Sequence, residues 1–254
     1  MSRHARRLGL YLGVVFVLGA VAAASASAAP LEYRTCVKAA KSGKFYTGKY
    51  VDKTCTTPAS EAQIKEGKLN KYESQAAAEE APYTGKNKAA TITAAGKTIV
   101  CKKGKSAGEL TTERFATDTF TFEKCAIGKA ACQSPGSSAG TIKSNLLHTG
   151  LVFLDEAETK VGVLVTSLGP ILQIECGATT IQVNGHIIGS VTNTTKGMTE
   201  TFAVSGGKQA AQNFWVEEEG FGPFTLFTEN EAEEEVEATL SLATEDGPKG
   251  VTAI

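Results

Sequence analysis

Hydrophobic and polar residues alternate with a period of two over most of the chain from Asn87 onward. The alternation in residues 117–122 places Phe120 and Phe122 on one face, and residues 235–242 show the clearest run of this kind. Such a pattern is typical of antiparallel strands that bury one face and expose the other.

About ten short strands are predicted, with turn residues between them and no long amphipathic helix. They fall in residues 90–93, 98–101, 117–122, 146–154, 160–167, 171–176, 179–183, 187–192, 201–204, 213–217, 224–228 and 235–242. Asn184-Gly185 is a strong hairpin signal between two of them. We therefore predict an all-β domain over residues 87–254, an antiparallel β-sandwich or barrel.

The region before it has a shorter-range pattern. Glycine stands beside an aromatic residue at Gly43-Lys44-Phe45 and Gly48-Lys49-Tyr50, which favours a small hairpin. Residues 57–67 predict one short helix, with Thr57 as its cap, Pro58 as its first residue and Gly67 as its stop. We interpret residues 29–73 as a small basic module and residues 74–86 as a linker.

Residues 1–28 have the pattern of an export signal. Basic residues precede an apolar run from Leu8 to Val21, and small residues follow, with Ala26-x-Ala28 as the expected cleavage site. The apolar run is shorter than the ~20 residues of a spanning helix, and no later stretch is long enough. We expect a secreted protein, extracellular or associated with the cell envelope, with no membrane span after signal removal.

Six cysteines follow the signal: Cys36, Cys55, Cys101, Cys125, Cys132 and Cys176. An even number in an exported chain, with no Cys-x-x-Cys pair and no Cys/His cluster, predicts three disulfides rather than a metal site. The sequence does not choose among the possible pairings. Our hypothesis is Cys36–Cys55 and Cys125–Cys132 as local loops and Cys101–Cys176 as a long-range link.

The net charge of −1 hides an asymmetry. Residues 31–105 hold 15 Lys/Arg against 7 Asp/Glu, whereas residues 106–254 hold 8 against 20. One interpretation is two independently solvated faces, or a basic segment lying on an acidic domain. The other is that the basic part meets an anionic polymer or polysaccharide of the cell envelope.

Catalytic motifs are weak. Gly136-Ser137-Ser138-Ala139-Gly140 matches Gly-x-Ser-x-Gly, and Ser138, Asp155 and His186 follow in the order of a hydrolase triad. That motif needs a strand that turns sharply into a helix, and here a Ser-Pro-Gly turn precedes it and a strand-like run follows it. We therefore predict no catalytic residue at this motif.

Other candidate sites also have simpler explanations. His148 and His186 are interpreted as turn or strand-break residues rather than zinc ligands, and neither a metal site nor a cofactor is predicted. The runs of glutamate residues are interpreted as solvated charges at sheet edges rather than as the pair of catalytic carboxylates of a glycosidase. The aromatic residues Phe214, Trp215, Phe221, Phe224 and Phe227 are predicted to form core, with Trp215 as the exception that could bind a ligand. Tyr46 and Tyr50 are the other candidates for ligand binding. No nucleic-acid-binding motif occurs.

The segment Tyr46-Thr-Gly-Lys-Tyr50-Val-Asp-Lys-Thr-Cys55 resembles a set of secreted proteins from soil actinobacteria that carry Tyr-x-Gly-x-Tyr-x-Asp-x-x-Cys after a signal peptide. The likeness extends through Phe122-Glu-Lys-Cys125, Cys132-Gln-Ser-Pro-Gly136 and Ile174-Glu-Cys176. It implies export and disulfides, and it implies no activity. The function predicted is a non-enzymatic binding or structural role at the cell envelope or outside the cell. The alternative is a secreted hydrolase that acts on a polysaccharide or an ester.

Overall fold

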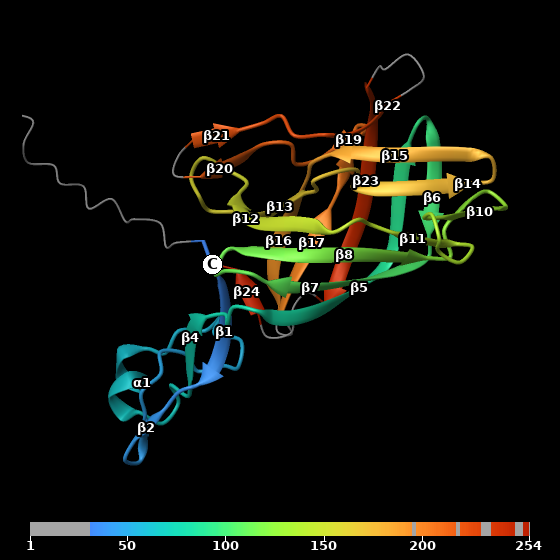
Figure 1. The fold of residues 1–254 in the computed structure, drawn as a ribbon. Coiled ribbons are helices and arrows are strands. Elements are labelled where there is room, and N and C mark those ends of the chain that lie inside the picture. Colours follow the sequence, from blue (N-terminus) through green and yellow to red (C-terminus); the bar gives the residue numbers. More distant parts are fainter. Residues whose placement is uncertain (1–30, 195–196, 217–218, 230–234, 247–250, 254) are drawn as a thin grey trace, which may run out of the picture. The chain divides into compact units, whose positions relative to one another are not determined.

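The computed structural model describes residues 31–194, 197–216, 219–229, 235–246 and 251–253. The predicted signal sequence, residues 1–28, lies outside this range. In the described residues, strands dominate and one short helix occurs, so the predicted fold class is confirmed (Figure 1).

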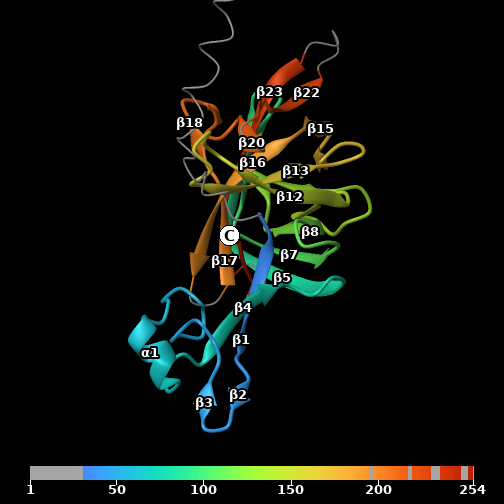
Figure 2. The ribbon, with the colours of Figure 1, turned by 90° about the vertical axis from the view of Figure 1, so that its left-hand side faces the viewer.

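An N-terminal module is built on a small antiparallel sheet. Its strand order is β24–β1–β4, formed by Val251–Ala253, Tyr33–Lys38 and Tyr72–Ala76. The β2–β3 hairpin (Lys41–Ser42 and Phe45–Tyr46) lies beside α1 (Glu61–Glu66), as Figure 2 shows. The backbone amide of Tyr46 joins the two by donating to the carbonyl of Gly67.

The helix begins later than the sequence predicted. Ser60, not Thr57, is its N-cap, and a capping box forms because Ser60 and Gln63 exchange side-chain to backbone hydrogen bonds. Pro58 instead pairs with Tyr50 in an isolated bridge. The predicted stop is confirmed, because Gly67 ends the helix at φ +61°.

Eight strands close an antiparallel barrel. Following the hydrogen-bonded neighbours, they are β5 (Ala81–Ala94), β7 (Lys103–Leu110), β8 (Phe115–Glu123), β12 (Leu147–Phe153), β13 (Val161–Thr166), β16 (Ile187–Thr194), β17 (Gly197–Phe202) and β23 (Glu235–Asp246), which returns to β5. Each connection is antiparallel, as the alternating pattern predicted.

A second, curled sheet continues from the other halves of β5 and β23. Its further strands are β6 (Lys97–Cys101), β9 (Ala126–Ile127), β10 (Ala130–Gln133), β14 (Leu172–Cys176), β15 (Thr179–Gly185) and β22 (Leu226–Glu229). Among the remaining strands, β11 (Thr141–Lys143) pairs with β8, and β20 (Phe214–Val216) forms a hairpin with β21 (Glu219–Phe221). A two-stranded ribbon, β18 (Val204–Ser205) and β19 (Lys208–Gln209), lies between β17 and β20 in the chain.

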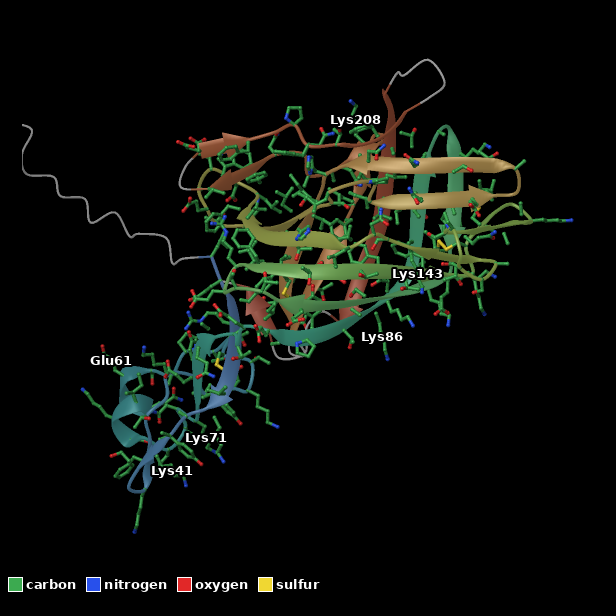
Figure 3. The ribbon with its side chains drawn as sticks, in the orientation of Figure 1. Lys41, Glu61, Lys71, Lys86, Lys143 and Lys208 are labelled. Atoms are coloured by element: carbon green, nitrogen blue, oxygen red, sulfur yellow. A yellow bond between two sulfur atoms is a disulfide. The ribbon has the colours of Figure 1, made fainter. Side chains whose placement is uncertain are left out.

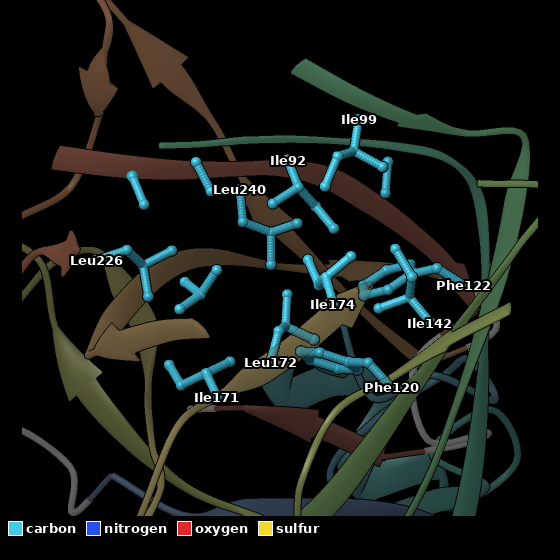
Figure 4. Close-up of a cluster of buried hydrophobic side chains, with 14 of the residues drawn as sticks. Ile92, Ile99, Phe120, Phe122, Ile142, Ile171, Leu172, Ile174, Leu226 and Leu240 are labelled. Carbon is cyan, nitrogen blue, oxygen red and sulfur yellow. The ribbon is translucent and has the colours of Figure 1, made fainter. Parts of the chain in front are cut away.

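The largest buried cluster joins the barrel to the curled sheet (Figure 4). It includes Ile92, Ile99, Phe120, Phe122, Ile142, Leu172, Ile174 and Leu240, each at most 1% exposed. The rings of Phe120 and Phe122 lie on one face of β8, as predicted, and their centroids are 6.0 Å apart. A second cluster fills the other end of the barrel and contains Leu31 and Tyr33 from the N-terminal segment.

The six cysteines form three disulfides, which indicates an oxidising, extracellular environment. The predicted Cys36–Cys55 bridge is confirmed. The predicted Cys101–Cys176 and Cys125–Cys132 bridges are wrong, because the pairs are Cys101–Cys125 and Cys132–Cys176. The reason is strand order: β9 pairs with β6 and β10 pairs with β14, so the two cysteines of one hairpin face different neighbouring strands.

The predicted linker at residues 74–86 is mostly strand. Residues 72–76 form β4 and residues 81–94 form β5, which leaves only a short connection between them. This short connection also contacts the barrel, because the amide of Glu80 donates a hydrogen bond to the carbonyl of Leu110.

Candidate functional site

Polar side chains gather inside one end of the eight-stranded barrel. Asp118 on β8 is 3% exposed, and the hydroxyl of Tyr83 on β5 lies 3.1 Å from its Oδ2 and 3.2 Å from the carbonyl oxygen of Thr117. The strand register explains why Tyr83 and Asp118 lie together, because Tyr83 pairs with Gly108 of β7, which in turn pairs with Asp118. A Cβ on Gly108 would lie 2.6 Å from the Tyr83 ring, so the ring occupies the space that a side chain would fill.

Three further groups complete this interior cluster. Tyr33 of β1 is 2% exposed and its phenol interacts with the hydroxyl of Thr149 on β12. Glu200, on β17, is partly buried. It lies close enough to Asp118 for the charge of Asp118 to raise the pKa of Glu200, and close enough to Tyr33 for the charge of Glu200 to raise the pKa of Tyr33. We call Asp118, Glu200, Tyr33, Tyr83 and Thr149 the interior cluster.

The environment favours the neutral forms of these groups. Burial raises the pKa of Asp118 to about 6, against the opposing effect of hydrogen bonds from the Thr119 amide and Tyr83. Burial, together with the charge of Asp118, raises the pKa of Glu200 to about 8. Burial also raises the pKa of both tyrosines, so their phenols keep their protons. The cluster can therefore take up or release protons near neutral pH.

Sequence reasoning missed this cluster, although a signal was present. Asp118 stands in phase with Ala116, Phe120 and Phe122, and Glu200 stands in phase with Met198 and Phe202. With a period of two, an acid in phase with apolar residues must point to the buried face. That rule would have identified both carboxyl groups.

A cavity of about 430 Å³ opens beside Tyr83. Its walls come from β1 and β4 on one side and from the start of β5 and the end of β7 on the other. Small side chains such as Ala76, Ala78 and Ala81 form much of the lining, and no charged residue takes part. The cavity can accept an apolar group, and it places open space next to the interior cluster.

The N-terminal module carries a concentrated positive charge. Residues 31–77 hold nine Lys/Arg against five Asp/Glu. The ammonium groups of Lys38 and Lys41 lie 5.9 Å and 4.8 Å from the centroid of the Tyr46 ring. Figure 3 shows Lys41 and Lys71 on this module. Of its eight lysines, only Lys49 lies within salt-bridge distance of a described carboxylate, 3.7 Å from Glu73.

The Tyr46–Cys55 motif shapes this module. Gly48 passes so close to β4 that a Cβ would lie 2.3 Å from the carbonyl oxygen of Tyr72. Burial opposes ionisation of Asp52, but hydrogen bonds from Thr54, Thr56 and Thr57 outweigh it and hold its pKa below the usual range. The motif is therefore explained by turn formation.

The two tyrosines named as ligand candidates differ in role. Tyr50 is half-buried and its backbone bridges to β4 through Tyr72, which gives it a structural task. Tyr46 is likewise half-buried, and its ring is the one that the two lysines approach. Only Tyr46 lies where a ligand could contact both a ring and positive charge.

The aromatic group was predicted to form core, and this is wrong. Phe214, Phe224 and Phe227 are only partly buried and Phe221 is 42% exposed. Three of the rings stack, with 5.2 Å between the centroids of Phe214 and Phe221 and 5.2 Å between those of Phe214 and Phe224. Trp215, the predicted exception, is the member that packs against a buried cluster. Phe214 and Phe221 belong to the β20–β21 hairpin, which in the described residues pairs with barrel strand β12 only where Trp215 stands opposite Phe153.

Ser138, Asp155 and His186, which follow the order of a hydrolase triad in the sequence, each interact with a different residue. The Ser138 hydroxyl lies 3.1 Å from that of Thr141 in an exposed turn. Asp155 accepts from Thr159 in the turn between β12 and β13. His186 packs edge-on against Phe224, with 5.4 Å between ring centroids. None of these described contacts joins any two of the three.

His148 and His186 also have different surroundings. His148 is exposed on β12, whereas the Nδ1 atom of His186 is buried without a hydrogen-bond partner. Across the described ranges, no group of three or more His, Cys, Asp or Glu side chains is placed to hold a metal ion. Within the same ranges no helix is long and apolar enough to cross a membrane.

No protein-family model, curated protein or solved structure matches the chain. The resemblance to actinobacterial secreted proteins therefore stays a prediction.

Proposed function

We propose that the chain is a secreted binding protein that attaches, without catalysis, to an anionic polymer of the cell envelope through its N-terminal module. The observation that carries this proposal is the convergence of Lys38 and Lys41 on the ring of Tyr46, among lysines that the described carboxylates leave largely unneutralised. The three disulfides support a place outside the cytoplasm, and export through residues 1–28 is part of the proposal.

The physical basis is electrostatic. Lysine ammonium groups act as point charges for phosphate or carboxylate groups. At physiological salt, charge is screened beyond ~8 Å, so a polymer with closely spaced anions gains more from such a surface than a single small anion does. The module keeps its shape because Cys36–Cys55 closes it and Asn70, fully buried, donates to the carbonyls of Tyr46 and Gly48.

The test is sedimentation with insoluble peptidoglycan that carries its anionic polymer, compared with the same material stripped of that polymer. We expect retention on the first only, and we expect it to fall steeply as salt rises. The double variant Lys38→Gln/Lys41→Gln should reduce the bound fraction at least about tenfold. The matched control is Lys129→Gln/Lys143→Gln, which removes equal charge from exposed positions on the β domain.

Two results would contradict the proposal. One is the absence of retention even at low salt. The other is an equal loss of binding in the module variant and in the control variant, since that would mean that total charge, and not the module, determines binding.

A further inference from the structure

Another cavity, of about 340 Å³, lies on the outer face of the barrel wall. Three residues in register across neighbouring strands form its floor, because Gly150 of β12 pairs with Phe115 of β8 on one side and with Leu164 of β13 on the other. On β12 the side chain of the opposite phase, Leu151, is buried in the second core cluster inside the barrel. The alternation of the strands therefore assigns this row to the outer face.

Phenylalanine rings from two parts of the chain line this cavity. Phe115 is 52% exposed, and a Cβ on Gly150 would lie 2.9 Å from its Cε1, so the ring rests over bare backbone. Phe214 and Val216 reach the cavity from β20, whereas Trp215 between them packs against the second core cluster. We call the cavity the outer groove, and its apolar borders are Phe115, Gly150, Leu164, Phe214 and Val216.

The ring of Phe214 is held in place by other rings. Its centroid lies 5.2 Å from that of Phe221 and 5.2 Å from that of Phe224, with interplanar angles of 21° and 29°. Stacked rings are a favourable arrangement of aromatic side chains. A wall that is already ordered binds a further ring at a low cost in conformational entropy.

Arg114 supplies a permanent positive charge to the outer groove. Its Nε donates a 2.9 Å bond to the carbonyl of Leu151, and its guanidinium carbon lies 5.9 Å from the ring centroid of Phe115. The two terminal nitrogens have no hydrogen-bond or salt-bridge partner among the described residues. Arg114 is half-buried, so water solvates this charge only in part. A carboxylate matches these nitrogens, because its two oxygens can accept two parallel N–H···O bonds.

The other polar groups of the outer groove offer few hydrogen bonds. The hydroxyls of Thr149 and Thr166 already donate to the carbonyls of Ala116 and His148, each at 3.3 Å. The imidazole of His148 is the remaining polar side chain in the lining. A sugar would therefore lose hydrogen bonds between its hydroxyl groups and water without replacing them. The lining matches a ligand that has an apolar ring and one anionic group.

We propose that the outer groove binds a small aromatic carboxylic acid. The ring of the ligand lies against Phe115 and Phe214, and the two terminal nitrogens of Arg114 bind its carboxylate. The volume falls within the ~300–1,000 Å³ of small-molecule sites. None of the lining residues belongs to the N-terminal module, so this site does not depend on the polymer binding proposed above.

A chemical-shift titration of the protein with phenylacetate tests the proposal. The backbone amides of Gly150 and Leu164 are the reporters, and the amide of the fully buried Ile99 on β6 is the internal reference. We expect the two reporters to shift and to saturate with a dissociation constant of about 1 mM or below, while Ile99 stays unchanged. Phenylacetamide has the same ring and no charge, and glucuronate has a carboxylate on a hydroxylated ring. Each should bind at least about tenfold more weakly than phenylacetate.

Two matched pairs of variants assign the binding to the outer groove. Arg114→Gln should weaken phenylacetate binding at least about tenfold and change phenylacetamide binding less than about threefold. Lys143→Gln, which removes a charge from an exposed position on β11, should change neither. Phe115→Ala should weaken the binding of both ligands at least about fivefold. Phe45→Ala removes an equally exposed ring, also 52%, from the N-terminal module and should have no effect.

Three results with the wild-type protein would overturn the proposal. The first is the absence of saturation at Gly150 and Leu164 at about 10 mM phenylacetate. The second is equal affinity for phenylacetate and phenylacetamide, because Arg114 would then not bind the carboxylate. The third is equal or tighter binding of glucuronate. An equal loss of phenylacetate binding in Arg114→Gln and Lys143→Gln overturns it as well. Should a variant fail to fold, the three ligand comparisons on the wild-type protein still decide.

Discussion

Cys132 and Cys176 stand directly opposite each other in the antiparallel pair β10–β14, with their Cα atoms 4.3 Å apart. This is close to the spacing of residues that face each other without exchanging backbone hydrogen bonds, where side chains approach most closely. Cys101 and Cys125 show the same arrangement, with a Cα separation of 4.0 Å beside the Val100–Ala126 pair. Both bridges therefore link neighbouring strands of the curled sheet.

Removal of the Cys132–Cys176 bridge should lower the stability of the β domain. The bridge spans 44 residues, and its loss in Cys132→Ser/Cys176→Ser should reduce the free energy of unfolding by about 4 kcal/mol on the chain-entropy view. Urea unfolding under non-reducing conditions measures this. The comparison variant Cys36→Ser/Cys55→Ser should instead loosen the module and leave the barrel transition within about 1 kcal/mol. Equal effects on the barrel would show that the two bridges do not stabilise separate parts.

The stability of the barrel should fall as pH rises. The folded pKa of Asp118, about 6, exceeds its ordinary value of 3.8, so the folded state holds this proton more tightly. Stability is then highest below pH 4 for this group and decreases until about pH 6, by about 3 kcal/mol. Asp118→Asn should remove that part of the decrease, as measured by urea unfolding at pH 4, 6 and 8. If Asp118→Asn keeps the full wild-type decrease in the free energy of unfolding with pH, Asp118 is not the source of that decrease.

The fold class could be predicted because the alternating pattern follows directly from one buried sheet face. Phe120 and Phe122 show this most clearly, since their shared face in the sequence is their shared face in the core. The closure of the barrel and the disulfide pairing could not be predicted. They depend on which strands become neighbours, and β10 joins β14 across more than 40 residues of chain.

The candidate sites likewise have some features that could be predicted from the sequence and others that could not. The basic character of the module is a property of composition, so the sequence revealed it. The convergence of lysines on Tyr46 depends on the β2–β3 hairpin, whose Lys41 pairs with Tyr46 directly. The interior cluster depends on shape as well as phase, because Tyr83 reaches Asp118 only over a glycine, Gly108, on the intervening strand.

Ser60 should stabilise the short helix, and Thr57 should not. Ser60→Ala removes the acceptor for the Gln63 amide and should lower the protection of that amide by an amount equivalent to about 1 kcal/mol. Thr57→Ala is the control, because the described hydrogen bonds of Thr57 use its backbone only: its amide donates to Asp52 and its carbonyl accepts from the amide of Val51. Hydrogen exchange at Gln63 and Ile64 measures both. An equal loss in the two variants would contradict the assignment of the cap.

Gly108 should tolerate no side chain. A Cβ there would lie 2.1 Å from the carbonyl oxygen of Thr117 and 2.6 Å from the Tyr83 ring, and the first of these atoms is backbone that cannot move without breaking the β7–β8 pairing. We expect Gly108→Ala to reduce the free energy of unfolding by about 3 kcal/mol.

Gly169 provides the matched control, since a Cβ there meets no atom within 4 Å. Gly169→Ala should change the free energy of unfolding by less than about 0.5 kcal/mol. Thermal and urea unfolding of the two variants measure the difference. Near-equal stabilities would mean that β7 and β8 can separate locally at Gly108, and then the close packing of Tyr83 against Asp118 would not be what fixes this end of the barrel.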